Sequence, residues 1–175
     1  MAVAIKEEAP EAVKPVDKCP ECLAGNLGWL LTQAHFNLVS EVGAALEPLG
    51  VSNRGYHVLA TARTGEYTQK ELAERIGLDK TTMVVTVDEL EEKGLAERKP
   101  SSTDRRARVI AVTKAGDRTV AQGQKIIDRI QSDVLESLPA KERKVFLESL
   151  GSLVKDRLAQ PAPDAPPLRR REPRP

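Results

Sequence analysis

The sequence predicts an α+β chain that is mostly helical, and three observations lead to this class. Aromatic residues make up 3% and charged residues 30% of the 175 residues, which is typical of helices packed through Leu and Val. Apolar residues recur at helical spacing on both sides of the middle of the chain. Between them, two short strand-like runs flank a polar segment and predict one small hairpin. The length fits a single domain.

The segment from Tyr67 to Thr113 organises the rest of the chain. Thr68 and Glu71 have the spacing of a capping box and predict the start of a helix. Gly77 stands where a left-handed C-cap is expected, and Asp79 is a good N-cap for a second helix. The inward positions of that second helix, which ends at Gly94, are Met83, Val87 and Leu90. Two helices joined in this way form a helix-turn-helix, whose second helix suits a DNA major groove.

Two strand-like runs come next, Leu95 to Lys99 and Arg108 to Val112, separated by the polar stretch PSSTDRR. They predict a hairpin, or wing, with Arg105 and Arg106 at its basic tip. Thr113 then caps a further helix. The fold class is therefore a winged helix-turn-helix within a mostly helical α+β chain.

The segments KELAERIGLDKTT, LEEKGLAER and DRRARVIAVTKAG occur in this order and resemble the MarR family of bacterial transcription regulators. The resemblance extends over residues 25–158. It implies a repressor that binds a near-palindromic operator as a homodimer and is released by a small-molecule effector. It also implies that Asp104 braces the wing and that Arg106 enters the minor groove. The residues expected to contact DNA are Thr68, Gln69, Lys80, Thr81, Thr82, Val84, Val85, Arg98, Asp104, Arg105, Arg106 and Arg108.

Val84 and Val85 stand where many members of that family have polar or basic residues. Facing outward, they would pack on thymine methyl groups and favour an A·T-rich site. The alternative is that one of the two packs inside the domain.

The helices on either side of the wing segment carry long apolar stripes. A first helix is predicted from about Glu21 to Glu47, and its middle is apolar on nearly all sides, which favours burial against a second subunit. Two more are predicted from Thr113 to about Glu136 and from Pro139 to about Leu158. The expected organisation is a flexible arm (1–18), a dimerisation helix (19–51), the winged helix-turn-helix (52–113), C-terminal dimerisation helices (114–158) and a disordered Pro/Arg-rich tail (159–175).

Cys19 and Cys22 form a CPEC knuckle, for which three interpretations remain open. Such a turn can supply half of a zinc site, but zinc needs two further ligands, and His35 and His57 are the only histidines. The pair can instead be redox-active, or can begin a helix with neither role. The alternative function is accordingly a metal- or thiol-responsive regulator or an interaction module.

An aromatic anion is the effector class that the resemblance implies, in a crevice between the dimerisation helices and the winged helix. Such a ligand needs ring surface together with cationic or hydrogen-bonding groups. Candidate lining residues are Trp29, His35, Phe36, Arg54, Tyr56 and His57. Alternatively, the aromatic residues belong to the subunit interface.

Other classes of protein lack support in the sequence. There is no Gly-rich phosphate loop, metalloprotease motif or nucleophile elbow, so no enzyme and no required cofactor are expected. No apolar run approaches the length of a membrane span, and the acidic, Pro-bearing start is unlike a signal peptide, so a cytoplasmic protein is expected. The acidic residues of the second helix, Asp88, Glu89, Glu91 and Glu92, are expected to form a solvated face.

Overall fold

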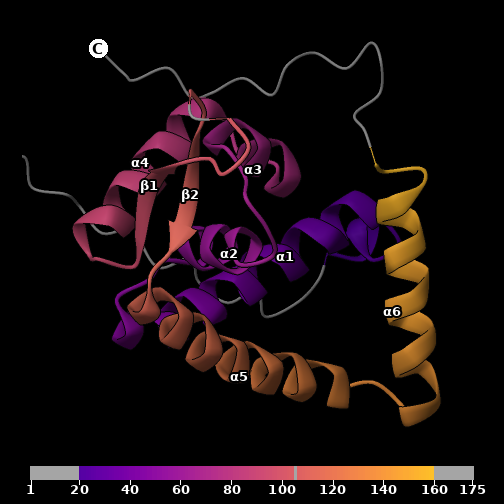
Figure 1. Cartoon of the computed structure of the whole chain (residues 1–175). Helices are drawn as coiled ribbons and strands as arrows, with labels where there is room; N and C mark the ends of the chain where they lie inside the picture. Colours follow the sequence, from indigo (N-terminus) through magenta and orange to yellow (C-terminus); the bar gives the residue numbers. More distant parts are fainter. Residues whose placement is uncertain (1–19, 105, 160–175) are drawn as a thin grey trace, which may run out of the picture.

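A computed structural model describes residues 20–104 and 106–159 (Figure 1). The predicted arm, Cys19, Arg105 and the tail from residue 160 onward lie outside these ranges. Along the described residues the elements are η1 (Glu21–Leu23), α1 (Leu27–Leu46), η2 (Glu47–Leu49), α2 (Asn53–Ala62), α3 (Gln69–Ile76), α4 (Lys80–Glu92), β1 (Ala96–Pro100), β2 (Arg108–Val112), α5 (Lys114–Glu136) and α6 (Ala140–Lys155).

The first long helix begins later than the sequence predicted. A 3-10 turn occupies Glu21–Leu23, and α1 starts at Leu27. The Asn26 side chain accepts a hydrogen bond from the Trp29 N–H at 2.8 Å and so caps the helix. An Asn N-cap is a strong start signal that the prediction overlooked. The helix has 20 residues and is therefore about 30 Å long.

Helices α2, α3 and α4 form the part of the molecule where the core is densest. Ser52 caps α2 by accepting from the Gly55 N–H. The predicted caps of α3 are present: Thr68 and Glu71 form the reciprocal capping box, and Gly77 is left-handed at φ 70°. The largest fully buried side chains come from α1 to α4 and are Leu46, Val58, Leu59, Leu72, Met83 and Val87. The three inward positions predicted for α4 are all buried.

The sheet is a single antiparallel hairpin, with Ala96 opposite Val112 and Pro100 opposite Arg108. Each strand lies within one residue of its predicted range. The Ile110 N–H donates to the Tyr67 carbonyl oxygen at 3.0 Å. This bond ties the second strand to the chain just before α3, so the hairpin packs beside the helix pair (Figure 1). The mostly helical winged-helix class is confirmed.

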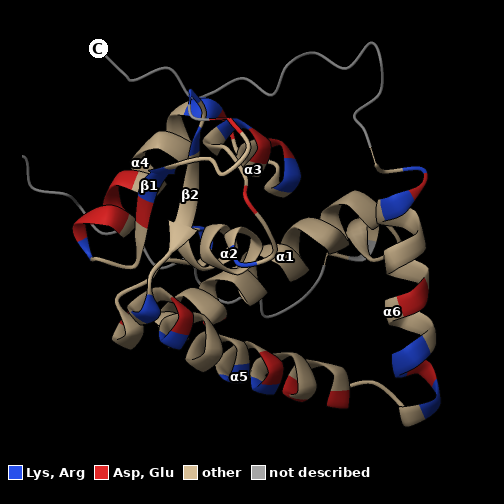
Figure 2. Ribbon diagram, in the orientation of Figure 1, with Lys and Arg blue, Asp and Glu red and all other residues tan. Residues whose placement is uncertain are grey.

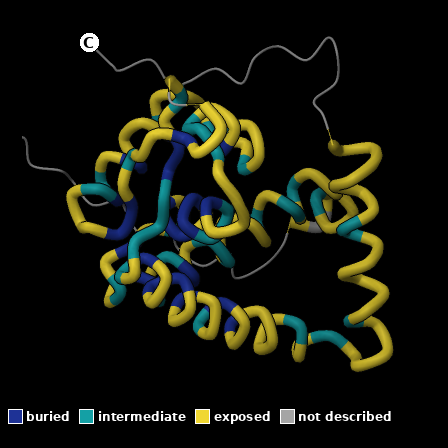
Figure 3. The backbone as a smooth tube through the Cα atoms, in the orientation of Figure 1, coloured by how far each residue is buried: buried dark blue, intermediate teal, exposed yellow. Residues whose placement is uncertain are grey.

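Helix α5 crosses below this domain, and α6 turns away from it at one side (Figure 1). Close packing of α5 depends on two glycines: a Cβ at Gly116 would lie 2.1 Å from the Leu95 carbonyl oxygen, and one at Gly123 would lie 2.9 Å from the Tyr56 ring. In contrast, α6 has no buried residue, and Figure 3 shows it almost entirely exposed. No helix in the described ranges has both the length and the apolar character that crossing a membrane requires.

Candidate nucleic-acid interface

The beginning of α4 is fixed by Asp79. Its carboxylate accepts from the N–H groups of Thr81 and Thr82, both at 3.0 Å, and from the Thr82 hydroxyl at 2.6 Å. These two N–H groups are therefore already bonded and do not form a free phosphate cradle. Lys80 and Thr81 are exposed, so their side chains can contact an anion at this turn.

The outer face of α4 carries the two valines. Val84 is 37% exposed and Val85 50% exposed, so neither is committed to the core. Val84 also lines a groove of about 720 Å³ between α3 and α4, together with Lys70, Lys80 and other residues of the two helices. Val85 is the more exposed of the two valines. An exposed aliphatic side chain here can pack on a methyl group but cannot form a hydrogen bond with a base edge.

The wing turns sharply at Asp104. The Arg106 N–H donates to the Asp104 carboxylate at 2.9 Å, and the Ala107 N–H donates to the Asp104 carbonyl at 3.0 Å. Arg106 and Arg108 are exposed, and their side chains form no ion pair with any described residue. The turn therefore presents cations at the free end of the hairpin, where Figure 2 shows Lys and Arg. Arg105 lies outside the described residues.

Glu66 holds the start of the wing loop, directly after β1, a role that the sequence did not predict. Its carboxylate accepts from the Ser102 N–H at 2.9 Å and from the hydroxyls of Ser101 and Ser102 at 3.0 Å each. These hydrogen bonds, first among them the one from the Ser102 N–H, lower the pKa of Glu66 below its ordinary 4.5. The loop before α3 is thereby joined to the hairpin. No local pattern links Glu66 to serines 35 and 36 residues away.

The sequence predicted that Arg98 is a cation of the wing that contacts DNA, but the structure pairs it with carboxylates of α4. It pairs with Glu91 and, at 2.7 Å, with Asp88, both on α4. Its side chain is 29% exposed. Gln69, another predicted DNA contact, accepts from the same guanidinium at 3.3 Å. The expectation that the acidic residues of α4 are only a solvated face is therefore wrong for Asp88 and Glu91.

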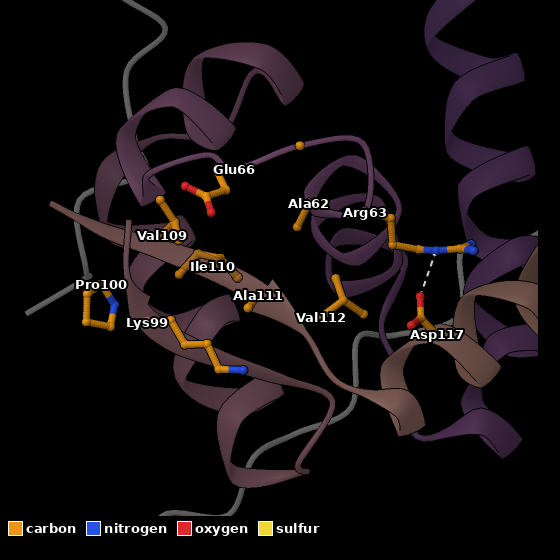
Figure 4. A pocket seen from close by; sticks show the side chains of 11 residues that line it. Ala62, Arg63, Glu66, Lys99, Pro100, Val109, Ile110, Ala111, Val112 and Asp117 are labelled. Atoms are coloured by element: carbon orange, nitrogen blue, oxygen red, sulfur yellow. Dashed lines mark ion pairs between the residues drawn. The ribbon is translucent and has the colours of Figure 1, made fainter. Parts of the chain in front are cut away.

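A hollow of about 450 Å³ lies beside β2 (Figure 4). Arg63 and Asp117 pair across one end of it at 2.9 Å, and Glu66 and Lys99 lie toward the hairpin. Two acidic and two basic side chains give this hollow no net charge with which to select an anion.

The six predicted effector residues are spread over α1 and α2. Tyr56 is buried, and its hydroxyl donates to the Gln124 amide oxygen at 2.6 Å, so it serves the contact with α5. Burial raises the Tyr56 pKa, with a smaller contribution from Asp128. The His57 ring meets the Tyr56 ring edge-on at 5.9 Å, and desolvation lowers its pKa. His35, Phe36, Arg54 and His57 are exposed, and Trp29 is half-buried.

The predicted thiol site is described only in part. Cys22 is exposed and carries a free thiol, whereas Cys19 lies outside the described residues. Within residues 20–104 and 106–159, no three His, Cys, Asp or Glu side chains are grouped as a metal site would need.

The chain is similar to several proteins of known structure. Residues 56–107 match the family model described as MarR family. CouR from Rhodococcus jostii RHA1, bound to p-coumaroyl-CoA, is 30% identical with a TM-score of 0.69, over 78% of this chain and 97% of that one. A MarR-family transcriptional regulator from Rhodococcus sp. RHA1 is also 30% identical, with a TM-score of 0.68, over 77% and 96%.

A third structure, the transcriptional repressor CouR bound to a 23-mer DNA duplex, shares the fold with a TM-score of 0.71 at 24% identity, over 79% of this chain and 99% of that one. These relatives are regulators rather than enzymes. The two 30% identical relatives are matched over nearly their whole length, and the part that the family model covers holds the helix pair, β1 and the wing loop as far as residue 107. On this evidence the chain belongs to the MarR family of transcriptional regulators.

Proposed function

We propose that this chain is a repressor that binds a near-palindromic operator as a homodimer. The observation that carries the proposal is the pairing of two outward features on one domain: the exposed α4 face with Val85, and the wing with Arg106 held by Asp104. A helix suits the major groove, and an arginine suits a narrow minor groove. The DNA-binding unit would be residues 52–113.

The uncovered apolar faces of α1 and α6 support the homodimer. Their exposed side chains are Leu27, Leu30, Phe36, Val145, Phe146, Leu147, Leu153 and Val154, and Leu158 is exposed just beyond the end of α6. Gathered apolar surface of this kind is typical of an interface between subunits. Residues 19–51 and 114–158 would form this region, and a two-fold dimer would place its recognition helices about 34–36 Å apart, one helical turn of DNA.

Release by a small aromatic anion completes the proposal. CouR, 30% identical, has been solved with an aromatic CoA ester. Here Trp29, Phe36, His35, Arg54 and His57 are the candidate contacts, and Tyr56 is left out because its hydroxyl bonds Gln124. Salicylate-like anions and an aromatic CoA thioester should weaken DNA binding, and Arg54→Ala should abolish the effect.

One observation supports the alternative of a thiol-responsive regulator, namely the exposed Cys22 thiol. On this alternative, peroxide should release DNA only when Cys22 is present.

The DNA contact is tested with Arg106→Ala on labelled duplexes at several salt concentrations. The wing arginine contacts the minor groove whatever the sequence, so affinity should fall on every duplex, and the slope of log K against log salt should become shallower by about 1. Arg129→Ala, which removes an exposed arginine on α5, is the matched control and should bind as the wild type does. Equal affinity of Arg106→Ala and the control would contradict the wing assignment.

A further inference from the structure

One guanidinium joins three elements of the proposed DNA-binding unit, β1, α3 and α4. Arg98 lies on β1, opposite Ile110 of β2. Its Nη1 pairs with the Glu91 carboxylate, and its Nη2 donates to Asp88 at 2.7 Å and to Gln69 at 3.3 Å. Asp88 and Glu91 are three residues apart on α4 and therefore share one face of that helix. Gln69 is the first residue of α3.

The backbone of Arg98 strengthens the same connection. Its N–H donates to the second oxygen of Glu91 at 2.7 Å. Glu91 is thus held by both the main chain and the side chain of one strand residue, and its own side chain is only 30% exposed. The hydrogen bonds between the guanidinium and the two carboxylates have both partners charged, and such bonds are shorter and stronger than neutral ones. The angle between β1 and α4 is therefore fixed by several directional contacts at a single residue.

The charge balance argues against a direct phosphate contact by Arg98. Two carboxylates surround one guanidinium, so the cluster of Arg98, Asp88 and Glu91 carries a net negative charge. Such a cluster would repel phosphate if it lay against the DNA backbone. In contrast, Arg106 and Arg108 form no ion pair with the described residues. Arg106 and Arg108 are therefore the arginines of the hairpin that attract the DNA phosphates.

We infer that Arg98 is a positioning residue that fixes the orientation of the wing relative to the recognition helix α4, so that the two can enter neighbouring grooves together. This inference rests on the proposed DNA binding. The spacing of the two grooves is fixed by the duplex. If the wing can move relative to α4, it does not stay in the minor groove while α4 occupies the major groove. Lysine cannot take over, because an ammonium lacks the planar fork that reaches Asp88, Glu91 and Gln69 at once.

The test compares Arg98→Lys and Arg98→Met with the wild type on two duplexes, the selected operator and a scrambled duplex of the same composition. Both variants should lower the ratio of operator affinity to scrambled-duplex affinity by about tenfold, with scrambled affinity and salt slope unchanged. Lys99→Met is the matched control, since Lys99 is the next residue of the same strand and, among the described residues, forms its ion pair with Glu97 of that strand at 2.6 Å and not with α4. It should keep the wild-type ratio.

The other outcomes overturn the inference. If Arg98 contacts phosphate, Arg98→Lys should retain the ratio, and Arg98→Met should reduce the salt slope by about 1. If its role is only to keep the domain folded, both affinities should fall in equal proportion. Asp88→Asn provides a milder variant, because Asp88 is 58% exposed, and it should also lower the ratio while the protein stays folded. A wild-type protein that does not prefer any sequence would instead refute the proposed function itself.

Discussion

Gly116 gives the sharpest stability prediction, because the space around it is occupied by backbone. A Cβ at this position would lie 2.1 Å from the Leu95 carbonyl oxygen, about 0.9 Å inside the 3.0 Å limit for real Cβ contacts, and 2.7 Å from Val112. The Leu95 oxygen also accepts from the Thr113 N–H at 3.1 Å. Gly116→Ala must therefore push α5 away from the end of α4 and strain this hydrogen bond.

The expected cost follows from these contacts. Forcing a methyl group into packed structure costs about 1–3 kcal/mol, and weakening one hydrogen bond costs about 0.5–1.5 kcal/mol. The helix propensity of alanine returns about 1 kcal/mol. We expect a net loss of about 0.5–3.5 kcal/mol, measured by urea unfolding at one fixed protein concentration, because the proposed dimerisation would contribute to stability.

Gly43→Ala is the matched control. It also lies inside a helix, but nothing is within 4 Å of its Cβ position, so it should leave stability unchanged or raise it by up to about 1 kcal/mol. Equal stability of the two variants would refute the close approach of α5 to the α4–β1 junction.

Three further predictions concern the wing, the recognition helix and the dimer. Glu66→Ala should lower the protection factor of the Ser102 N–H at neutral pH. Folding lowers the pKa of Glu66, so its hydrogen bonds to Ser101 and Ser102 are fully present above the ordinary Glu pKa of 4.5 and are lost as the pH falls through the lowered value. The protection factor of the wild type should therefore approach that of the variant only below that pH range. Val85→Ser should shift the sequences selected from random DNA away from A·T, and an unchanged consensus would remove Val85 from the interface. Phe146→Lys should convert the proposed dimer to monomer in sedimentation velocity, since it places a charge on the exposed α6 face; an intact dimer would show that this face is not the interface.

Local signals in the sequence were sufficient for the helix pair and the hairpin. Thr68, Gly77 and Asp79 act within three residues of their own positions, through capping bonds and a left-handed turn. Such features depend on the neighbouring backbone alone, and the structure confirms them. The start of α1 was predicted too early, because the long apolar stripe outweighed the signal from Gly25 and Asn26.

The contacts between elements were not visible in the sequence. Arg98 and the wing arginines are the same residue type on the same hairpin, yet Arg98 pairs with α4 and Arg106 is free of such pairs among the described residues. The difference arises because Arg98 lies on β1, which packs against α4, whereas Arg106 lies in the loop between the two strands. Glu66 likewise gains its partners only when the hairpin folds back onto the loop before α3. The spacing of residues in the sequence does not predict such contacts between separate elements of the fold.

Selection of bound sequences from random duplex DNA tests the central claim most directly. A homodimer with the braced wing and the exposed α4 face should enrich a near-palindrome, with A·T-rich half-sites whose centres lie one helical turn apart, about 10–10.5 base pairs. Selection with Arg106→Ala should recover far less DNA. Enrichment of no sequence, or recovery that is the same with and without the wing arginine, would contradict the account.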